Sequence, residues 1–490
     1  MPSWPECQLA VTYASPLALR QPRRAGGALL GLAGVALFAA HPSLFSREAL
    51  YPTVTAILFA GVLLSVCAHQ LTAGPAASGV SGSSGSLQSP RLLGSALLWT
   101  SGLFAFTVLL SAVVNSGPAW GRIWLPAAQI LYVWLGCWLA ADERVLAHLG
   151  SVLLLLASAA GVYALVQHLG LDPLPSGTVF EDRFVSVFDN PNHLGSCMAV
   201  ALPLALHCFL TRASLKRLAI WPYGAVIAMY TGLLLAGSRG AWWACLAGCG
   251  LLMAGYVRSV RRGDLILRWR HLLLLGLSLC LVTSVLSKTQ IMKGAGGEAV
   301  SMSARMRSST NVVGPSAAND SSVNHRYFLW HVAVNMIRER PLVGLGYGSY
   351  RVQYPRFRDQ LRQDPQFQHL SWLQQRYIPL YAHDEYLQRW AESGVFALLS
   401  FLALVGLGMA AALKAGWRGC GGLRPWALLG SLVALLIHAI VSYPFHMAVS
   451  GTIFWILLGI IYYPGRFPEI DKQEEYLLSR GTLHEEPGTK

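Results

Sequence analysis

The sequence predicts an all-α polytopic membrane protein with about twelve transmembrane helices and one large, partly helical loop between the ninth and the tenth. Three observations support this fold class. Apolar residues make up 54% of the 490 residues, charged residues only 12%, and the mean hydropathy is +0.46. Soluble domains carry about 25% charged residues. Many of the apolar residues also lie in runs of about 20, the length that spans a bilayer. This composition excludes a soluble enzyme and a disordered chain.

Twelve apolar runs are separated by charged residues, Pro or Gly-Ser clusters. They lie near residues 26–44, 50–70, 92–114, 121–141, 145–170, 194–211, 218–237, 241–257, 272–287, 387–413, 426–445 and 447–464. The first run lacks a clean cleavage site after it, so we interpret it as a retained helix.

These runs divide the chain into five parts. We expect a cytoplasmic N-terminus at 1–25, helices 1–9 within 26–287, a periplasmic loop at 288–386, helices 10–12 within 387–464 and a cytoplasmic tail at 465–490.

Basic residues flank alternate ends of the predicted helices. Short loops rich in Lys and Arg stay in the cytoplasm. The residues that mark this side are Arg20, Arg23, Arg24, Arg212, Lys216, Arg217, Arg258, Arg261, Arg262, Arg268, Arg270, Lys414, Arg418 and Arg424. Both termini and the Gly-Ser linker at 73–89 are then cytoplasmic, while residues 171–193 and the long loop face outward.

The predicted outer loop is strongly basic. Residues 288–380 contain twelve Lys or Arg and five acidic residues, an excess of seven positive charges. Such a surface suits an anionic ligand, and it equally suits a solvated face near anionic lipid. The whole chain carries a net charge of +14, which would suggest nucleic acid for a soluble protein. For a chain in the bilayer we expect no nucleic-acid partner.

Within the outer loop, composition and spacing predict three segments. Residues 296–324 are rich in Ser, Asn, Gly and Ala, so we expect them to be flexible. Apolar residues at helical spacing predict a helix from His325 to Arg340, and Pro341 ends it. A second amphipathic stretch covers about 354–376.

Three glycines alternate with larger residues directly after the first of these helices. Gly344, Gly346 and Gly348 lie in P-L-V-G-L-G-Y-G-S-Y. Glycine permits positive φ and a close approach of the backbone, here expected to be toward a ligand. The pattern alone has low specificity.

Three further places on the outer side could carry chemistry. Arg239 lies in the three-residue turn S-R-G between two apolar runs, where a charged group is commonly functional. Its alternative is an arginine that snorkels to the interface. The second place is N-P-N at 190–192, for which we favour a turn that starts a helix. The third is His383 at the outer end of the tenth helix, a candidate base whose alternative is an ordinary interfacial histidine.

Four motifs occur in order along the chain: F-D-N-P-N-H-L-G-S at 188–196, S-R-G-A-W at 238–242, H-R-Y-F-L-W through P-L-V-G-L-G-Y-G-S-Y at 325–350, and A-H-D-E-Y-L-Q-R-W-A-E-S-G-V at 382–395. Together they resemble the O-antigen ligase and Wzy-type polymerase family. The resemblance covers roughly residues 180–410, and the first helices match by topology alone.

The resemblance implies a membrane glycosyltransferase of the bacterial inner membrane. It would transfer a glycan from undecaprenyl diphosphate to a hydroxyl of lipid A-core or of a growing polysaccharide, at the periplasmic face and without metal or cofactor. By the same resemblance, His383 is the general base, and Arg239 and Arg326 are catalytic arginines. Asp384 departs from the family pattern, which has Asn there.

Further residues of the outer segments are candidates for binding the diphosphate or the substrate. They are Arg183, Asn190, Asn192, Arg338, Tyr347 and Glu385. Either Asp384 or Glu385 could orient the ring of His383. Adjacent residues on a helix point about 100° apart, so this acidic pair is a poor metal chelate.

Two other classes of function stay open at this point. A secondary transporter of a small solute such as bicarbonate would usually show ionisable groups within its spans and a repeated architecture. A non-catalytic scaffold for envelope assembly would not need His383. The sequence does not distinguish ligase from polymerase or from a protein-glycosylating relative, and it identifies neither the glycan, the acceptor nor the oligomeric state.

Overall fold

The computed structural model describes residues 88–115, 124–172, 179–180, 183–212, 220–288, 290–293, 299–307, 321–368 and 378–463. Several predicted segments lie outside these residues. They are the first two membrane spans, the Gly-Ser linker up to residue 87, both expected cytoplasmic termini, and residues 308–320 of the segment expected to be flexible.

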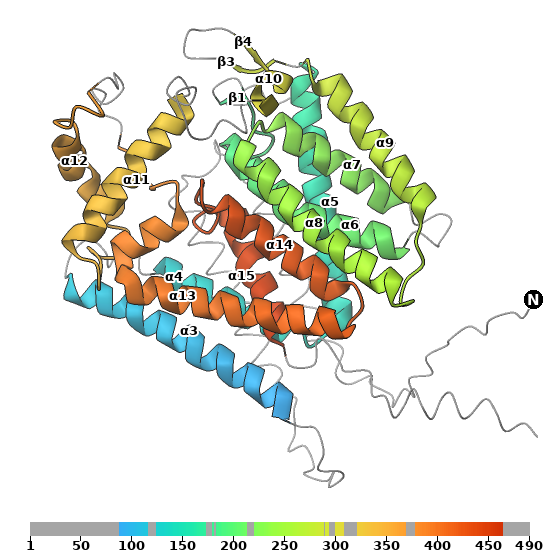
Figure 1. The fold of residues 1–490 in the computed structure, drawn as a ribbon, viewed down its shortest axis with the longest axis horizontal. Helices are drawn as coiled ribbons and strands as arrows, with labels where there is room; N and C mark the ends of the chain where they lie inside the picture. The colour runs from blue at the N-terminus through green and yellow to red at the C-terminus, as the bar shows by residue number, and fades with distance from the viewer. Residues whose placement is uncertain are drawn as a thin grey trace, which may run out of the picture.

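Within the described residues, ten apolar helices pack into a bundle (Figure 1). They are α3 (Gln88–Val114), α4 (Trp124–Leu139), α5 (Glu143–His168), α6 (Pro191–Arg212), α7 (Ile220–Leu235), α8 (Arg239–Arg261), α9 (Trp269–Leu286), α13 (Glu385–Arg418), α14 (Arg424–His438) and α15 (Ala448–Tyr462). Each predicted span within the described residues overlaps one of them. Six, namely α3, α5, α6, α8, α9 and α13, are long and apolar enough to cross a membrane, while the other four have between 10 and 17 residues. A total of twelve spans stays a prediction.

Close contacts between helices explain how this bundle packs. Glycine allows helix backbones to approach each other in membrane proteins. Gly248 of α8 lies against Gly430 of α14, and Gly459 of α15 lies against the backbone of α4 at Val133. In both places a side-chain Cβ would overlap the neighbouring backbone. Outward-facing residues of α3 and α9 are apolar and exposed, such as Trp99 at 76%, as expected for a lipid-facing surface.

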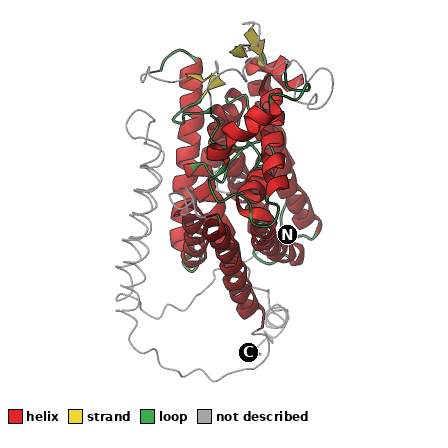
Figure 2. Cartoon of the chain, turned by 90° about the vertical axis from the view of Figure 1, so that its left-hand side faces the viewer, coloured by secondary structure: helices red, strands yellow, loops and turns green. Residues whose placement is uncertain are grey.

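The short strands lie together at one end of the bundle (Figure 2). Two antiparallel hairpins pair β1 (Val179–Phe180) with β2 (Arg183–Phe184) and β3 (Gln290–Lys293) with β4 (Ala299–Ser301). The helices α10 (Met302–Arg307), α11 (Ser321–Glu339) and α12 (Tyr350–Leu361) follow. The region between α9 and α13 is therefore partly helical, as predicted, although α12 is shorter than the expected stretch.

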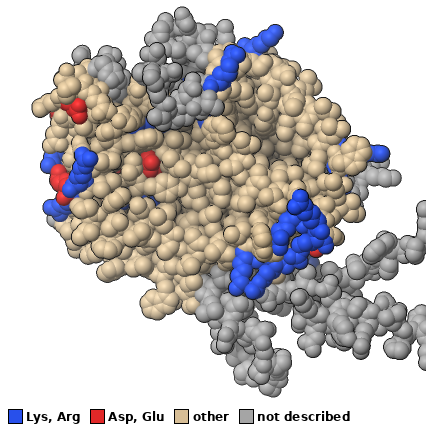
Figure 3. All heavy atoms as spheres, viewed as in Figure 1, with Lys and Arg blue, Asp and Glu red and all other residues tan. Residues whose placement is uncertain are grey.

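Basic residues gather at the opposite end, where α8 ends and α9 begins (Figure 3). Arg258 and Arg262 of this end both donate hydrogen bonds to the backbone oxygen of Trp417, at 2.8 and 3.1 Å. The basic loops near 258–270 and 414–424 therefore meet on one side of the molecule. This arrangement agrees with the alternation of basic flanks along the sequence.

Candidate functional site

His383 lies immediately before α13 in an unusual backbone conformation. Its φ is +56°, in the left-handed region that few residues other than glycine adopt. The next residue, Asp384, is the N-cap of α13, and its carboxylate accepts hydrogen bonds from the backbone N–H groups of Tyr386 and Leu387, both at 2.8 Å. Burial raises the pKa of Asp384 to about 6, although these two hydrogen bonds favour the carboxylate. Asp384 therefore fixes the start of the helix and the position of His383.

The His383 ring lies among aromatic rings and cations. It contacts Tyr443 edge-on at 4.8 Å and His325 at 6.1 Å between ring centroids. Burial lowers the pKa of His383 well below its usual value, and electrostatic interactions with Arg326, His325 and His193 lower it further. Its Nδ1 atom is buried and has no hydrogen-bond partner among the described residues. The imidazole is therefore neutral at pH 7.

Helix α11 brings Arg326 to His383. Its apolar residues Phe328, Val332 and Met336 are fully buried, the helix packs against α13, and Arg326 acts electrostatically on His383. Arg338 belongs to the same helix but is exposed. At a rise of about 1.5 Å per residue it lies about 18 Å from Arg326 along the helix. The structure does not bring Arg338 to the cluster around His383.

The motifs at 188–196 and 238–242 meet in space. The side-chain oxygen of Asn190 accepts a hydrogen bond from the backbone of Asn192 at 2.9 Å, and α6 begins at Pro191. This confirms the expected helix start at N-P-N. The Asn192 side chain accepts a hydrogen bond from the hydroxyl of Ser238 at 2.9 Å. Arg239, the next residue, is buried at the start of α8.

Two further arginines are buried near this end of the bundle. Arg183 of β2, a predicted candidate, is 6% exposed. Arg305 of α10 is 5% exposed, and its Nε atom lies 3.4 Å from the backbone oxygen of Gly237, next to the S-R-G turn. Sequence analysis did not select Arg305, because only its burial distinguishes it from the other arginines of the loop.

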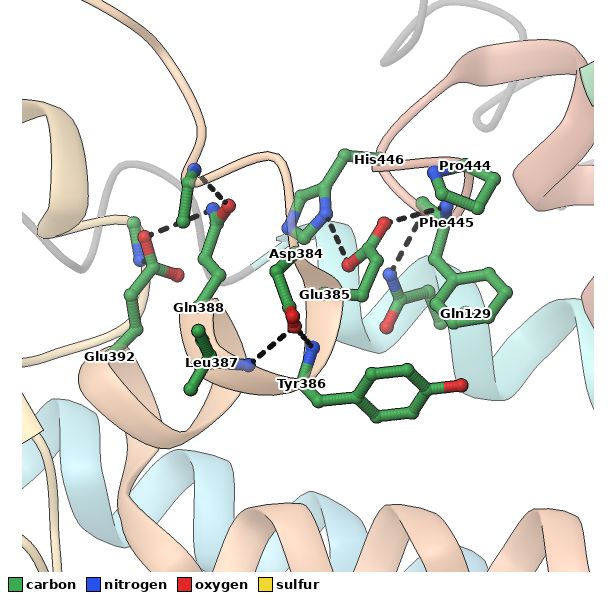
Figure 4. A network of polar contacts seen from close by, with 12 residues as sticks. Gln129, Asp384, Glu385, Tyr386, Leu387, Gln388, Glu392, Pro444, Phe445 and His446 are labelled. Carbon is green, nitrogen blue, oxygen red and sulfur yellow. Dashed lines mark hydrogen bonds and ion pairs between the residues drawn. The ribbon is translucent and has the colours of Figure 1, made fainter. Parts of the chain in front are cut away.

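Glu385 connects α13 to the segment between α14 and α15 (Figure 4). One carboxylate oxygen accepts a hydrogen bond from the backbone of Phe445 at 2.7 Å, and the other lies 2.8 Å from Nδ1 of His446. Tyr347 completes this group, with its hydroxyl 3.4 Å from Nε2 of His446. Burial raises the pKa of Tyr347 well above its usual value. The carboxylates of Asp384 and Glu385 thus contact groups other than the His383 ring. The expectation that one of them orients this ring is wrong.

The three alternating glycines have a structural role that differs from the expected one. Gly344, Gly346 and Gly348 do adopt positive φ, at 67°, 102° and 75°. Their loop packs against α13, where the backbone N–H of Gly346 donates to the backbone oxygen of Glu392 at 2.8 Å. A Cβ at Gly344 would overlap the backbone of Glu392. The close approach that these glycines permit in the structure is therefore to the backbone of α13.

Sequence analysis missed the aromatic and histidine side chains between α14 and α15. Tyr443 stacks on Tyr381 at 4.5 Å, and Tyr381 contacts His446 at 4.9 Å. These rings connect the surroundings of His383 to those of Tyr347. Residue 443 had been assigned to the end of the predicted span 426–445, and residue 446 to the gap before the span 447–464. Pro444 between two apolar runs was the available signal that this segment is not helical.

Comparison with known proteins agrees with three of the four sequence motifs, those at 238–242, 325–350 and 382–395. Residues 224–402 match the profile of the O-antigen ligase family, and this range contains Arg239, Arg326 and His383. A protein of Rickettsia conorii named as a candidate polysaccharide ligase is 35% identical over 88 residues, which are 18% of this chain and 20% of that protein. The chain therefore spans about a fifth of the length of this curated relative. Through residues 224–402, the chain is therefore similar to the O-antigen ligase family.

Proposed function

We propose that the protein is a membrane glycosyltransferase of the O-antigen ligase type. It transfers a glycan from undecaprenyl diphosphate to a hydroxyl of lipid A-core or of a growing polysaccharide. The observation that carries this proposal is the environment of His383, whose neutral ring interacts electrostatically with Arg326 and whose buried Nδ1 atom has no hydrogen-bond partner in the described part of the chain. A neutral imidazole held in this way can accept a proton.

The proposed reaction breaks the bond between the anomeric carbon and the diphosphate oxygen. As the acceptor oxygen forms its new bond to that carbon from the opposite face, His383 takes the hydroxyl proton. General-base catalysis of this kind typically contributes about 10² to 10⁴ in rate. The configuration at the anomeric carbon is thereby inverted.

Arg239 and Arg326 would bind the diphosphate as its negative charge develops. A guanidinium offers two parallel donors to phosphate oxygens, and each charged hydrogen bond contributes about 1.5 to 3 kcal/mol. Arg183 is a further buried donor that we assign to the same task. We propose that these arginines neutralise the leaving group without a divalent ion or another cofactor.

The remaining candidates have supporting roles in this proposal. Asn190 and Asn192 hold the turn beside Ser238, and Glu385 holds the segment that carries Tyr443 and His446. Tyr347 contacts His446 and would face the glycan. Arg338, exposed at the far end of α11, would contact only an extended part of the substrate.

We propose that the protein is a multi-pass protein of the bacterial inner membrane, with the site facing the periplasm and both termini in the cytoplasm. The support is the separation of the two ends of the bundle. The basic loops lie at one end, and His383, Arg326 and the S-R-G turn lie at the other.

Reconstituted transfer tests this function. The purified full-length protein in nanodiscs is incubated with undecaprenyl-diphosphate-linked O-antigen and lipid A-core. We expect glycosylated lipid A-core and free undecaprenyl diphosphate. A longer lipid-linked glycan instead would identify the polymerase reaction. If neither product forms, as a transporter or a scaffold predicts, the proposal is wrong.

A further inference from the structure

His193, in the first turn of α6, is paired with an acidic side chain. Its Nδ1 atom lies 2.5 Å from Oδ1 of Asp189, four residues earlier. The two side chains are only 19% and 14% exposed. This is the arrangement by which a carboxylate orients a histidine in many functional sites.

The pairing determines which nitrogen of His193 can accept a hydrogen bond. A carboxylate only accepts, so Nδ1 carries the hydrogen and Nε2 of the neutral ring keeps its lone pair. Nε2 is buried and has no hydrogen-bond partner among the described residues. A buried acceptor without a partner is costly, so a bound group that donates a hydrogen bond there would be favoured.

The rings of His193 and His383 lie against the same aromatic side chain. Both imidazoles contact the ring of Tyr443 edge-on, at 5.9 Å for His193 and 4.8 Å for His383. The residue next to His193, Asn192, is bonded to Ser238 beside Arg239. His193 is therefore held between the proposed base and the proposed diphosphate-binding turn.

The chemistry of this pair selects between the two substrates. A fully ionised diphosphate offers only acceptor oxygens and cannot donate to Nε2, and the negative charge of Asp189 would repel it. A sugar hydroxyl has a hydrogen to donate. We propose that His193, held by Asp189, is the binding residue for the acceptor: Nε2 accepts a hydrogen bond from a sugar hydroxyl next to the one that reacts. This inference rests on the proposed transfer reaction and adds the acceptor subsite to it.

Steady-state kinetics with each substrate varied separately test the subsite, using lipid-linked O-antigen as donor and lipid A-core as acceptor. His193→Phe keeps an aromatic ring against Tyr443 and removes the lone pair. We expect it to raise KM for the acceptor about tenfold, the effect of one lost hydrogen bond, with KM for the donor unchanged. His193→Gln, whose carbonyl oxygen can accept, should recover most of the affinity. Asp189→Leu should raise the acceptor KM as well, because Leu has no acceptor to hold the hydrogen on Nδ1.

His331→Phe on α11 is the matched control. His331 bonds the backbone oxygen of Tyr327 within its own helix, so this variant should leave both constants at wild-type values. An unchanged acceptor KM in His193→Phe would contradict the subsite, and so would an equal rise in both KM values, which indicates a merely structural role. If His193→Phe does not fold, an unchanged acceptor KM in Asp189→Leu decides against the proposal. A wild-type protein that transfers no glycan would instead contradict the transfer reaction itself.

Discussion

Replacing Glu392 by Ala should loosen the glycine loop at 344–350 from α13. Glu392 is 2% exposed, and its two carboxylate oxygens accept hydrogen bonds from the backbone of Gly348 at 2.9 Å and of Tyr350 at 3.1 Å. A third hydrogen bond comes from the side chain of Gln388 at 3.3 Å. The variant leaves these donors without their acceptor.

The magnitude follows from the donors that lose their partner. A buried N–H group without an acceptor costs about 1 to 3 kcal/mol. The N–H of Tyr350 is buried, whereas the hydrogen bond of Gly348 is partly accessible to water, which can replace it. We therefore expect a loss of about 2 to 4 kcal/mol for Glu392→Ala, and about 1 to 3 kcal/mol for Glu392→Gln, which retains one acceptor oxygen.

Hydrogen exchange of peptides that cover residues 344–350 measures this loss directly. A loss of 2 to 4 kcal/mol in local stability corresponds to exchange about 30 to 1,000 times faster if the loop opens locally. Glu339→Ala is the control, because its ion pair with Arg356 at 2.9 Å is largely exposed and worth at most about 1 kcal/mol. Unchanged protection of this loop in Glu392→Ala would refute the assignment of Glu392 as its anchor.

Three other predictions concern the proposed chemistry. Because the pKa of His383 is lowered, the base form persists below pH 6.5, and transfer should fall only as the pH drops through that lowered value. Arg326→Gln removes a positive charge beside the ring, so the acid limb of the pH–rate profile should move to higher pH. An acid limb that does not move would contradict the electrostatic effect of Arg326 on His383. Arg239→Lys and Arg326→Lys should be nearly as damaging as Ala, because a single ammonium cannot supply two parallel donors to a diphosphate; full activity of a Lys variant would show that charge alone suffices. Transfer should be equal with and without EDTA, and a loss that Mg²⁺ or Mn²⁺ restores would overturn the arginine mechanism.

Local patterns predicted much of the fold. The ten described apolar helices follow from runs of hydrophobic residues, and α11 follows from the spacing of Phe328, Val332 and Met336. The end of α14 did not follow from hydrophobicity. The predicted span continued to residue 445, but the helix ends at His438, because the next segment bonds to Glu385. The backbone N–H of Glu385 also donates to the oxygen of Ala439, at 2.9 Å.

The break in α13 had no local signal either. Gly394 lies at the start of an apolar run and has a φ of +81°. A Cβ there would overlap the backbone oxygen of Leu342, a residue about 50 positions earlier. Composition around Gly394 could not predict this contact, because it depends on how the glycine loop returns to α13.

The candidate site was predicted by resemblance rather than by spacing. His383, Arg239 and Arg326 came from motifs far apart in the chain, and periodicity alone gave each a structural alternative. His193, Tyr443 and His446 were missed because their proximity to these residues arises only when α6, α13 and the segment after α14 meet.

The most direct test of the account is transfer by the His383→Asn variant. Asn tolerates the left-handed backbone at this position better than Ala does, so the fold should be retained while the imidazole is lost. With protein levels matched to wild type and His331→Asn as the control, transfer from lipid-linked O-antigen to lipid A-core should fall by about 10² to 10⁴. A wild-type rate in His383→Asn would contradict the proposal that His383 is the general base.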